Sequence, residues 1–186
     1  GELAPHALEQ LLRQVAPAPL QEDALQGLAK SCGGRPALAE LAARALATTE
    51  LPAEGDPREA LASAVRRLPE ASAEVLATLL AADDWARTGD VASLVGGNPG
   101  EVQDRLQELA AEGFVRIAGA SGADDRVDLY HDLVRVLLAE GLGDDRIRQA
   151  HAAFVTHLRA QPSPSLERLV RHLLGAGDEP GASAVA

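Results

Sequence analysis

The chain has little sulfur and few aromatic residues. Methionine is absent, Cys32 is the single cysteine, and aromatic residues make up 2% of the 186 positions. A lone cysteine excludes an internal disulfide framework and zinc sites built from paired cysteines. No apolar run reaches the roughly 18 residues of a membrane span, and the N-terminus lacks the basic and apolar segments of a signal peptide. We therefore expect a cytoplasmic protein that makes no contact with a membrane.

Basic charge is also scarce. The chain has 28 acidic and 17 basic residues, with Lys30 as its one lysine, and a formal net charge of −11. Such a chain repels nucleic-acid phosphates as a whole. Hydrophobic residues nevertheless reach 46% and are mostly Leu, Ala and Val. This composition favours packed helices over sheets, so we expect a mainly α protein.

The N-terminal third predicts a helical subdomain over residues 1–55. Apolar residues at helical spacing predict helices over 3–15 and 21–31. A third helix should begin at Pro36, because proline suits the first turn, where no N–H donor is needed. A linker then leads to a fourth helix that we expect from Asp56 to Leu68.

The middle of the chain predicts a helix, a short helix and a capped helix. The first should span residues 70–82, and the second residues 89–95 with Thr88 as its N-cap. The third should begin at Asn98, a good N-cap, with Glu101 placed to complete a capping box.

Two β-like runs follow, at residues 114–118 and 126–130, with a loop rich in Gly, Ser and Asp between them. Helix, short helix, capped helix and hairpin, in this order, predict a winged helix-turn-helix with a small β-hairpin wing. We assign residues 56–142 to this domain.

The C-terminal residues 143–186 predict a helical hairpin. Helical patterns occur at residues 131–140, 145–159 and 166–174. The last residues resemble the start of a further helix or a frayed end. One hairpin is compatible with the beginning of a helical repeat array, but a single pair does not define a repeat.

We expect no catalysis from this chain. The pair Lys30-Ser31 is not a phosphate-binding loop, because Ala24 and Ala29 stand where the Walker A pattern requires glycine. The histidines lack metal-ligand spacing, and apart from His131 we expect them to be solvated or partly packed. They are His6, His131, His151, His157 and His172.

The winged-helix prediction raises the question of DNA binding. In that fold the third helix enters the major groove and needs cations for the phosphates. Here the helix carries four acidic residues and a single cation, Arg105. The acidic residues are Glu101, Asp104, Glu108 and Glu112. Direct DNA binding is therefore disfavoured, and protein contacts or regulation are the expected use of the fold.

Two short motifs bracket the predicted winged helix. Residues 32–41 read CGGRPALAEL, and residues 129–138 read LYHDLVRVLL. In this order and spacing they resemble the regulatory half of STAND ATPases, the signal-transduction ATPases that include NB-ARC proteins and bacterial transcriptional activators. Gly34-Arg35-Pro36 resembles the family's GxP motif in the helical lid. Residues 130–132 resemble its MHD motif, with tyrosine in place of methionine.

The resemblance implies roles for four residues. Pro36 would pack near the adenine with Gly34 supporting the turn. His131 would contact the β-phosphate of ADP, and Asp132 would hold the start of the local helix. A histidine at a helix N-terminus can donate to an anion beside free backbone N–H groups. On the residues alone, the favoured interpretation of His131 is a residue that starts the helix and helps the wing to pack, and the resemblance makes the two interpretations about equal.

The resemblance also implies partners. The chain has neither Walker A nor Walker B, so the ATPase core would lie upstream of Gly1, and helical repeats would follow downstream. ADP or ATP would bind only in the parent protein, and we expect no cofactor on the isolated fragment. Two alternatives stay open, a DNA-binding winged-helix regulator and a free-standing protein-interaction module.

Overall fold

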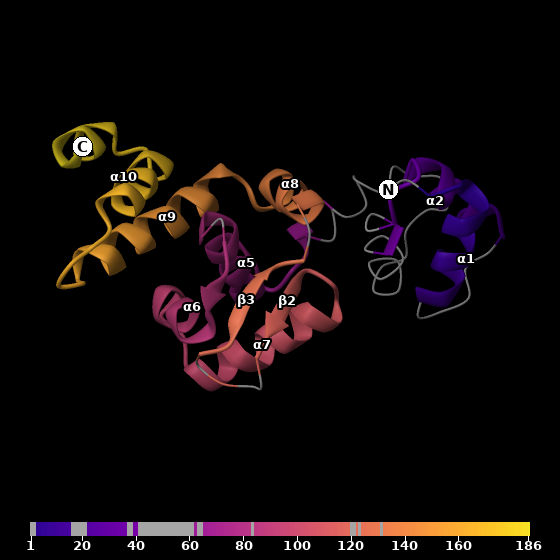
Figure 1. Cartoon of the computed structure of the whole chain (residues 1–186), viewed down its shortest axis with the longest axis horizontal. Coiled ribbons are helices and arrows are strands. Elements are labelled where there is room, and N and C mark those ends of the chain that lie inside the picture. Colours follow the sequence, from indigo (N-terminus) through magenta and orange to yellow (C-terminus); the bar gives the residue numbers. More distant parts are fainter. Residues whose placement is uncertain are drawn as a thin grey trace.

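The computed structural model describes residues 3–15, 22–36, 39–40, 62, 65–82, 84–119, 122, 124–130 and 132–186. This part of the chain is mainly helical and contains a small antiparallel sheet of three strands (Figure 1). The elements are α1 (Pro5–Val15), α2 (Glu22–Ser31), α5 (Glu70–Ala82), β1 (Ala86–Arg87), α6 (Thr88–Val95), α7 (Pro99–Ala111), β2 (Val115–Ala118), β3 (Arg126–Leu129), α8 (Asp132–Leu142), α9 (Asp144–Arg159), α10 (Leu166–Gly175) and α11 (Glu179–Val185). Within these ranges, no helix has the length and apolar character needed to span a membrane.

The two N-terminal helices pack through the apolar faces that the sequence predicts. Leu8 and Leu12 of α1 are fully buried, and Leu25 of α2 belongs to the same core. An ion pair of 2.7 Å between Arg13 and Glu22 joins the end of α1 to the start of α2. Helices α1 and α2 lie at one end of the molecule, and α10 and the C-terminus lie at the other (Figure 1).

Helix α5 is the centre of the fold. It contacts α6, α7, α8, α9 and β3, so most of its side chains are buried, and Leu76 and Leu79 have no exposed surface. A helix surrounded by packing partners is apolar on nearly every side. This explains why residues 70–82 are dominated by Ala, Leu and Val. The bounds Glu70–Ala82 confirm the predicted helix.

The sheet contains one strand more than the sequence predicts. The predicted hairpin forms between β2 and β3, with Val115 opposite Leu129 and Ile117 opposite Val127. Strand β1 adds to the other side of β3, so that the order is β1-β3-β2. It is two residues long and pairs Ala86 with Val127. Two residues cannot display the alternation by which a strand is recognised in sequence.

The two helix caps predicted in this region have different outcomes. Asn98 caps α7 as predicted, and its side chain accepts from the N–H of Gly100 at 2.9 Å. The prediction for Thr88 is wrong, because α6 begins at Thr88 itself and Arg87 occupies the cap position. The Thr88 hydroxyl instead donates to the carbonyl of Asp125 at 3.2 Å. Thr88 therefore ties α6 to the residue before β3.

The C-terminal part contains the predicted helices, and its last residues form the further helix α11. Helix α9 packs on both α5 and α10. Its first half joins the main core through Ala150 and Phe154. Its second half joins a smaller core with α10 and α11 through Val155 and Leu158. One helix thus takes part in two cores.

Gly141 allows a close contact between α8 and the segment around residues 62–65. A Cβ at Gly141 would lie 2.6 Å from Cγ1 of Val65 and 3.3 Å from the carbonyl oxygen of Ala62. Alanine in place of a helical glycine ordinarily stabilises by up to about 1 kcal/mol. Here we expect Gly141→Ala to lower the free energy of unfolding by about 1–3 kcal/mol, because α8 must move away from Val65 and Ala62.

Urea unfolding followed by circular dichroism measures this effect. Gly27→Ala is the matched control, because Gly27 is exposed within α2. The control should stabilise the chain by about 0.5–1 kcal/mol. Equal stabilisation by both substitutions would contradict the close contact at Gly141.

Candidate functional site

The first predicted motif lies in the turn after α2. Gly33 and Gly34 have φ values of 56° and 78°, a left-handed conformation that glycine adopts at little cost. The N–H of Leu3 donates to the carbonyl of Gly34 at 2.6 Å, which ties this turn to the start of the described chain. Pro36 is half-buried and helical, and Ala39 N donates to Arg35 O at 3.2 Å. The predicted helix start at Pro36 is therefore confirmed, while its contact with a nucleotide stays a prediction.

The second predicted motif lies at the junction between β3 and α8. The N–H of Tyr130 donates to the carbonyl of Phe114 at 2.9 Å, and the Tyr130 side chain is 41% exposed. His131 lies outside the described residues. Asp132 is the first residue of α8, as the predicted helix start requires. The predicted contact of His131 with the β-phosphate therefore also stays a prediction.

A buried carboxylate holds this junction from one side. Asp128 of β3 is 6% exposed and accepts three hydrogen bonds. The donors are Nη2 of Arg116 at 2.8 Å, Nη2 of Arg135 at 2.7 Å and the N–H of Leu129 at 2.8 Å. Arg116 comes from β2 and Arg135 from α8, so one carboxylate connects three elements. Charge-assisted bonds of this kind are stronger than neutral ones.

The Asp128 network fixes both neighbours of position 131. The strand before it carries the carboxylate, and the helix after it carries Arg135. The guanidinium of Arg116 also lies over the ring of Trp85, 4.6 Å from its centroid, which joins the residue before β1 to the network. The structure therefore orients α8 relative to the sheet through Asp128.

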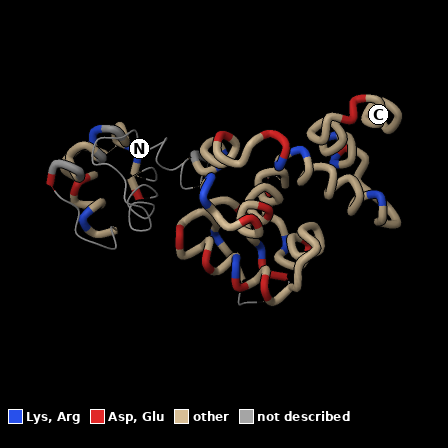
Figure 2. The backbone as a smooth tube through the Cα atoms, turned by 180° about the vertical axis from the view of Figure 1, so that it is seen from behind, with Lys and Arg blue, Asp and Glu red and all other residues tan. Residues whose placement is uncertain are grey.

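The exposed face of α7 is acidic. Glu101, Asp104 and Glu108 are exposed, and acidic positions recur along this helix at the bottom of the molecule (Figure 2). Partial desolvation and, after it, the charge of Glu108 raise the pKa of Glu112. The helix's one cation, Arg105, is half-buried and donates to the Ser72 hydroxyl at 3.4 Å. The face that would enter a DNA groove thus presents carboxylates.

Two cations of the sheet are already paired with carboxylates. Arg87 is paired with the exposed carboxylate of Asp124 at 3.6 Å, and Arg116 is paired with Asp128. A phosphate backbone approaching this surface would meet more negative than positive charge.

We expect no measurable binding of duplex DNA by this chain. The measurement is fluorescence anisotropy of a labelled random duplex at about 50 mM salt, where phosphate contacts are strongest. A variant with α7 made basic, Glu101→Lys combined with Asp104→Lys and Glu108→Lys, should bind weakly and lose that binding as salt rises. Micromolar binding by the natural chain would contradict this prediction.

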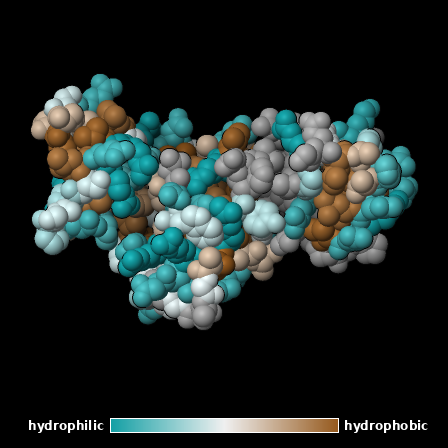
Figure 3. Space-filling view, in the orientation of Figure 1, coloured by the Kyte–Doolittle hydropathy of each residue, from teal (hydrophilic) through white to brown (hydrophobic). Residues whose placement is uncertain are grey.

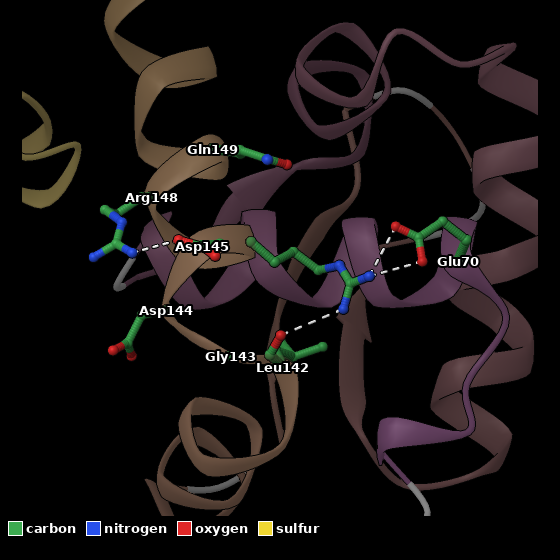
Figure 4. Close-up of a pocket in the computed structure, with 8 residues that line it drawn as sticks. Glu70, Leu142, Gly143, Asp144, Asp145, Arg148 and Gln149 are labelled. Atoms are coloured by element: carbon green, nitrogen blue, oxygen red, sulfur yellow. Dashed lines mark hydrogen bonds and ion pairs between the residues drawn. The ribbon is translucent and has the colours of Figure 1, made fainter.

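A hollow of about 590 Å³ lies beside the start of α9. Glu70 of α5 accepts from Arg146 of α9 at 2.7 and 2.8 Å, and the same guanidinium donates to the carbonyl of Leu142 at 3.3 Å (Figure 4). Arg148 is paired with Asp145 (Figure 4). Both arginines are therefore already neutralised by carboxylates. We interpret the hollow as structural, because the ion pair between Arg146 and Glu70 that lines it joins α9 to α5.

Metal ligation gives no candidate in the ranges that the structure describes, where no three His, Cys, Asp or Glu residues could hold one ion. Cys32 is buried at 1% exposure, as expected of a packed thiol.

Two histidines form a pair that the sequence analysis missed. Nδ1 of His151 in α9 lies 2.9 Å from Nδ1 of His172 in α10. His172 is fully buried, so the expectation of a solvated or partly packed side chain is wrong for this residue. Helical spacing contained the signal, since His172 lies beside the inward-facing Leu169 and Leu173. The partner was hidden because it belongs to another helix.

The comparisons with known proteins add no family to this description. The sequence matches no protein-family model and no curated protein.

Proposed function

We propose that residues 56–142 form a winged-helix domain and that the chain is the regulatory part of a STAND-type ATPase. The observation that carries the proposal is the order of elements. The order along the chain is helix, strand, helix, helix and two strands, and the three strands form a sheet of order β1-β3-β2. The MHD-like residues follow the last strand directly. The turn with the GxP-like residues precedes this unit, as the resemblance implies.

The proposed chemistry is recognition without catalysis. The described backbone starts α8 at Asp132, so a diphosphate at this point would meet the positive N-terminal end of a helix. His131 would add a side-chain donor. Pro36 would contact the adenine from the lid. The ATPase core of the parent protein would supply the catalytic residues and the other contacts to the nucleotide.

Regulation would follow from a difference in binding between two states. With ADP bound, the winged helix would be held against the core through His131. Exchange for ATP would remove this preference and release the domain for assembly. A nucleotide shifts such an equilibrium only by its differential affinity for the two states. The Asp128 network supports the proposal because it fixes the junction to the sheet.

The test is the nucleotide content of the natural full-length polypeptide. We expect near-stoichiometric ADP to be released on denaturation of the wild-type protein and to be lost from His131→Ala. The matched control is His157→Ala, in which a half-buried histidine of α9 is removed. ADP retained by His131→Ala would remove the sensor role, and the absence of nucleotide from the wild type would remove the ATPase proposal.

A free-standing protein-interaction module is the second candidate. It is favoured by apolar surface on α10, where Leu166 is 59% and Leu174 is 54% exposed. Figure 3 shows apolar surface over the C-terminal helices at the upper left. Contiguous exposed apolar patches are typical of protein interaction sites. The same nucleotide measurement separates the two candidates, because the second predicts no bound ADP.

A further inference from the structure

The His151–His172 pair lies in the packing between α9 and α10. The ring of His172 stacks on Phe154, with centroids 4.3 Å apart and planes 5° from parallel. On the other side of the pair, the ring of His151 lies against Gly175, where a Cβ would come within 2.5 Å of it. The two histidines are therefore confined, and their Nδ1 atoms face each other at hydrogen-bond distance.

The position of the protons on the two rings is restricted by Nε2 of His172. Nε2 of His172 is buried and has no hydrogen-bond partner in the part of the chain that the structure describes. In the neutral pair, His172 can donate from Nδ1 to His151 and keep Nε2 unprotonated. A buried N–H without an acceptor, which costs about 1–3 kcal/mol, is then avoided.

When the pair takes up one more proton, this arrangement is no longer available. If His172 takes the proton, Nε2 carries an N–H and the buried ring becomes charged. If His151 takes it, its Nδ1–H must donate to Nδ1 of His172, and the neutral His172 then carries its own proton on Nε2. Every singly protonated state that keeps the hydrogen bond therefore places an unsatisfied N–H in the interior.

The surrounding charges act in the same direction. Burial, and after it the charges of His151, Arg171 and Arg168, lower the pKa of His172 from 6.5 to about 4. From the other packed elements, Asp178 and Glu179 are exposed, and Asp178 caps α11 by accepting from Gly181.

The other charged groups of α9 are largely paired within the described residues. Arg148 is paired with Asp145, and Arg146 is paired with Glu70 of α5. The described charges that shift the pKa of His172 are His151, Arg171 and Arg168, and no carboxylate is among them.

We propose that the His151–His172 pair is an acid-sensitive latch that holds α10 and α11 on α9. The folded state binds the proton more weakly than the unfolded state. The latch is therefore fully stable above pH 6.5, and its stability falls as the pH decreases from 6.5 toward 4. This behaviour does not depend on the ATPase proposal, because neither histidine belongs to the MHD-like junction.

Hydrogen exchange measured by mass spectrometry tests the latch. In the wild-type chain we expect the protection factors of α10 and α11 to fall about 10- to 30-fold between pH 7.5 and 5.0, after correction for intrinsic rates. The protection of α7, which lies in the main core, should stay constant and serves as the internal reference. Unchanged protection of α10 would overturn the proposal.

Two variants separate the latch from a general effect of acid. His172→Phe keeps a ring that can stack on Phe154 and should abolish the fall in protection. His157→Phe, a matched substitution outside the pair, should leave that fall intact. A response that persists in His172→Phe would overturn the proposal.

If His172→Phe does not fold, the wild-type chain alone decides. The ring resonances of His172 should not titrate between pH 7.5 and 5.0 in nuclear magnetic resonance spectra. A titration of His172 near its ordinary pKa would overturn the proposal.

Discussion

Asp128→Ala is expected to lower the free energy of unfolding by about 3 kcal/mol. The Asp128 side chain as a whole is 9% exposed, and its carboxylate accepts hydrogen bonds from two guanidinium groups and one backbone N–H. The substitution leaves Arg135, whose side chain is only 20% exposed, partly buried without this carboxylate as its partner. Arg116 is about half exposed and stacks on Trp85, so it should contribute less to the loss. Urea denaturation of the purified chain measures the change.

The matched control is Asp124→Ala. Its carboxylate is 95% exposed and lies 3.6 Å from Arg87, so the loss should stay below about 0.5 kcal/mol. Similar losses in the two variants would contradict the structural role of Asp128. Adding Arg135→Met to Asp128→Ala should recover part of the stability, because it removes the more deeply buried of the two arginines that lost this carboxylate.

Most helices could be predicted because their signals are local. Apolar residues at helical spacing gave both ends of α5, and the Asn98-Pro99 pair gave the start of α7. The hairpin followed from two short apolar runs with a polar loop between them. Each of these patterns is complete within a stretch of fewer than twenty residues.

The errors come from contacts between distant residues. Thr88 looked like a cap because its neighbours are helical, but its hydroxyl bonds to Asp125, 37 positions further along the chain. Strand β1 is defined by its pairing with β3 and not by its own two residues. Hydrogen bonds between distant residues cannot be predicted from the spacing of apolar residues along the chain.

The candidate site divides in the same way. The turn before Pro36 and the helix start at Asp132 were predictable from glycine and from the motif. The Asp128 network was not, because its arginines lie 12 positions before it and seven after it, on separate elements. From its charge alone, Asp128 would have been expected on the surface, whereas the structure buries it.

Phe154→Ala is expected to destabilise the whole described C-terminal part of the fold, and not α9 alone. Phe154 is 3% exposed, packs in the main core and stacks on His172. Removing the ring should cost about 3–4 kcal/mol through lost burial and the cavity that remains. Phe154→Leu keeps most of the volume and should cost about 1–1.5 kcal/mol. Leu174→Ala, at a position 54% exposed, is the surface control and should change stability by less than about 0.5 kcal/mol.

The way in which Phe154→Ala unfolds is as informative as its stability. Trp85 is the single tryptophan and reports on the sheet, while circular dichroism reports on all helices. Because α9 contributes to both cores and is bound to α5 by Arg146 and Glu70, we expect the two signals to shift together to lower urea. A Trp85 transition that keeps its wild-type midpoint while helical signal is lost earlier would mean that α9 to α11 fold as a separate unit. In that case the acid-sensitive latch could open without affecting the α5–β3 core, whereas coincident transitions would couple the pH response of α10 to the junction at α8.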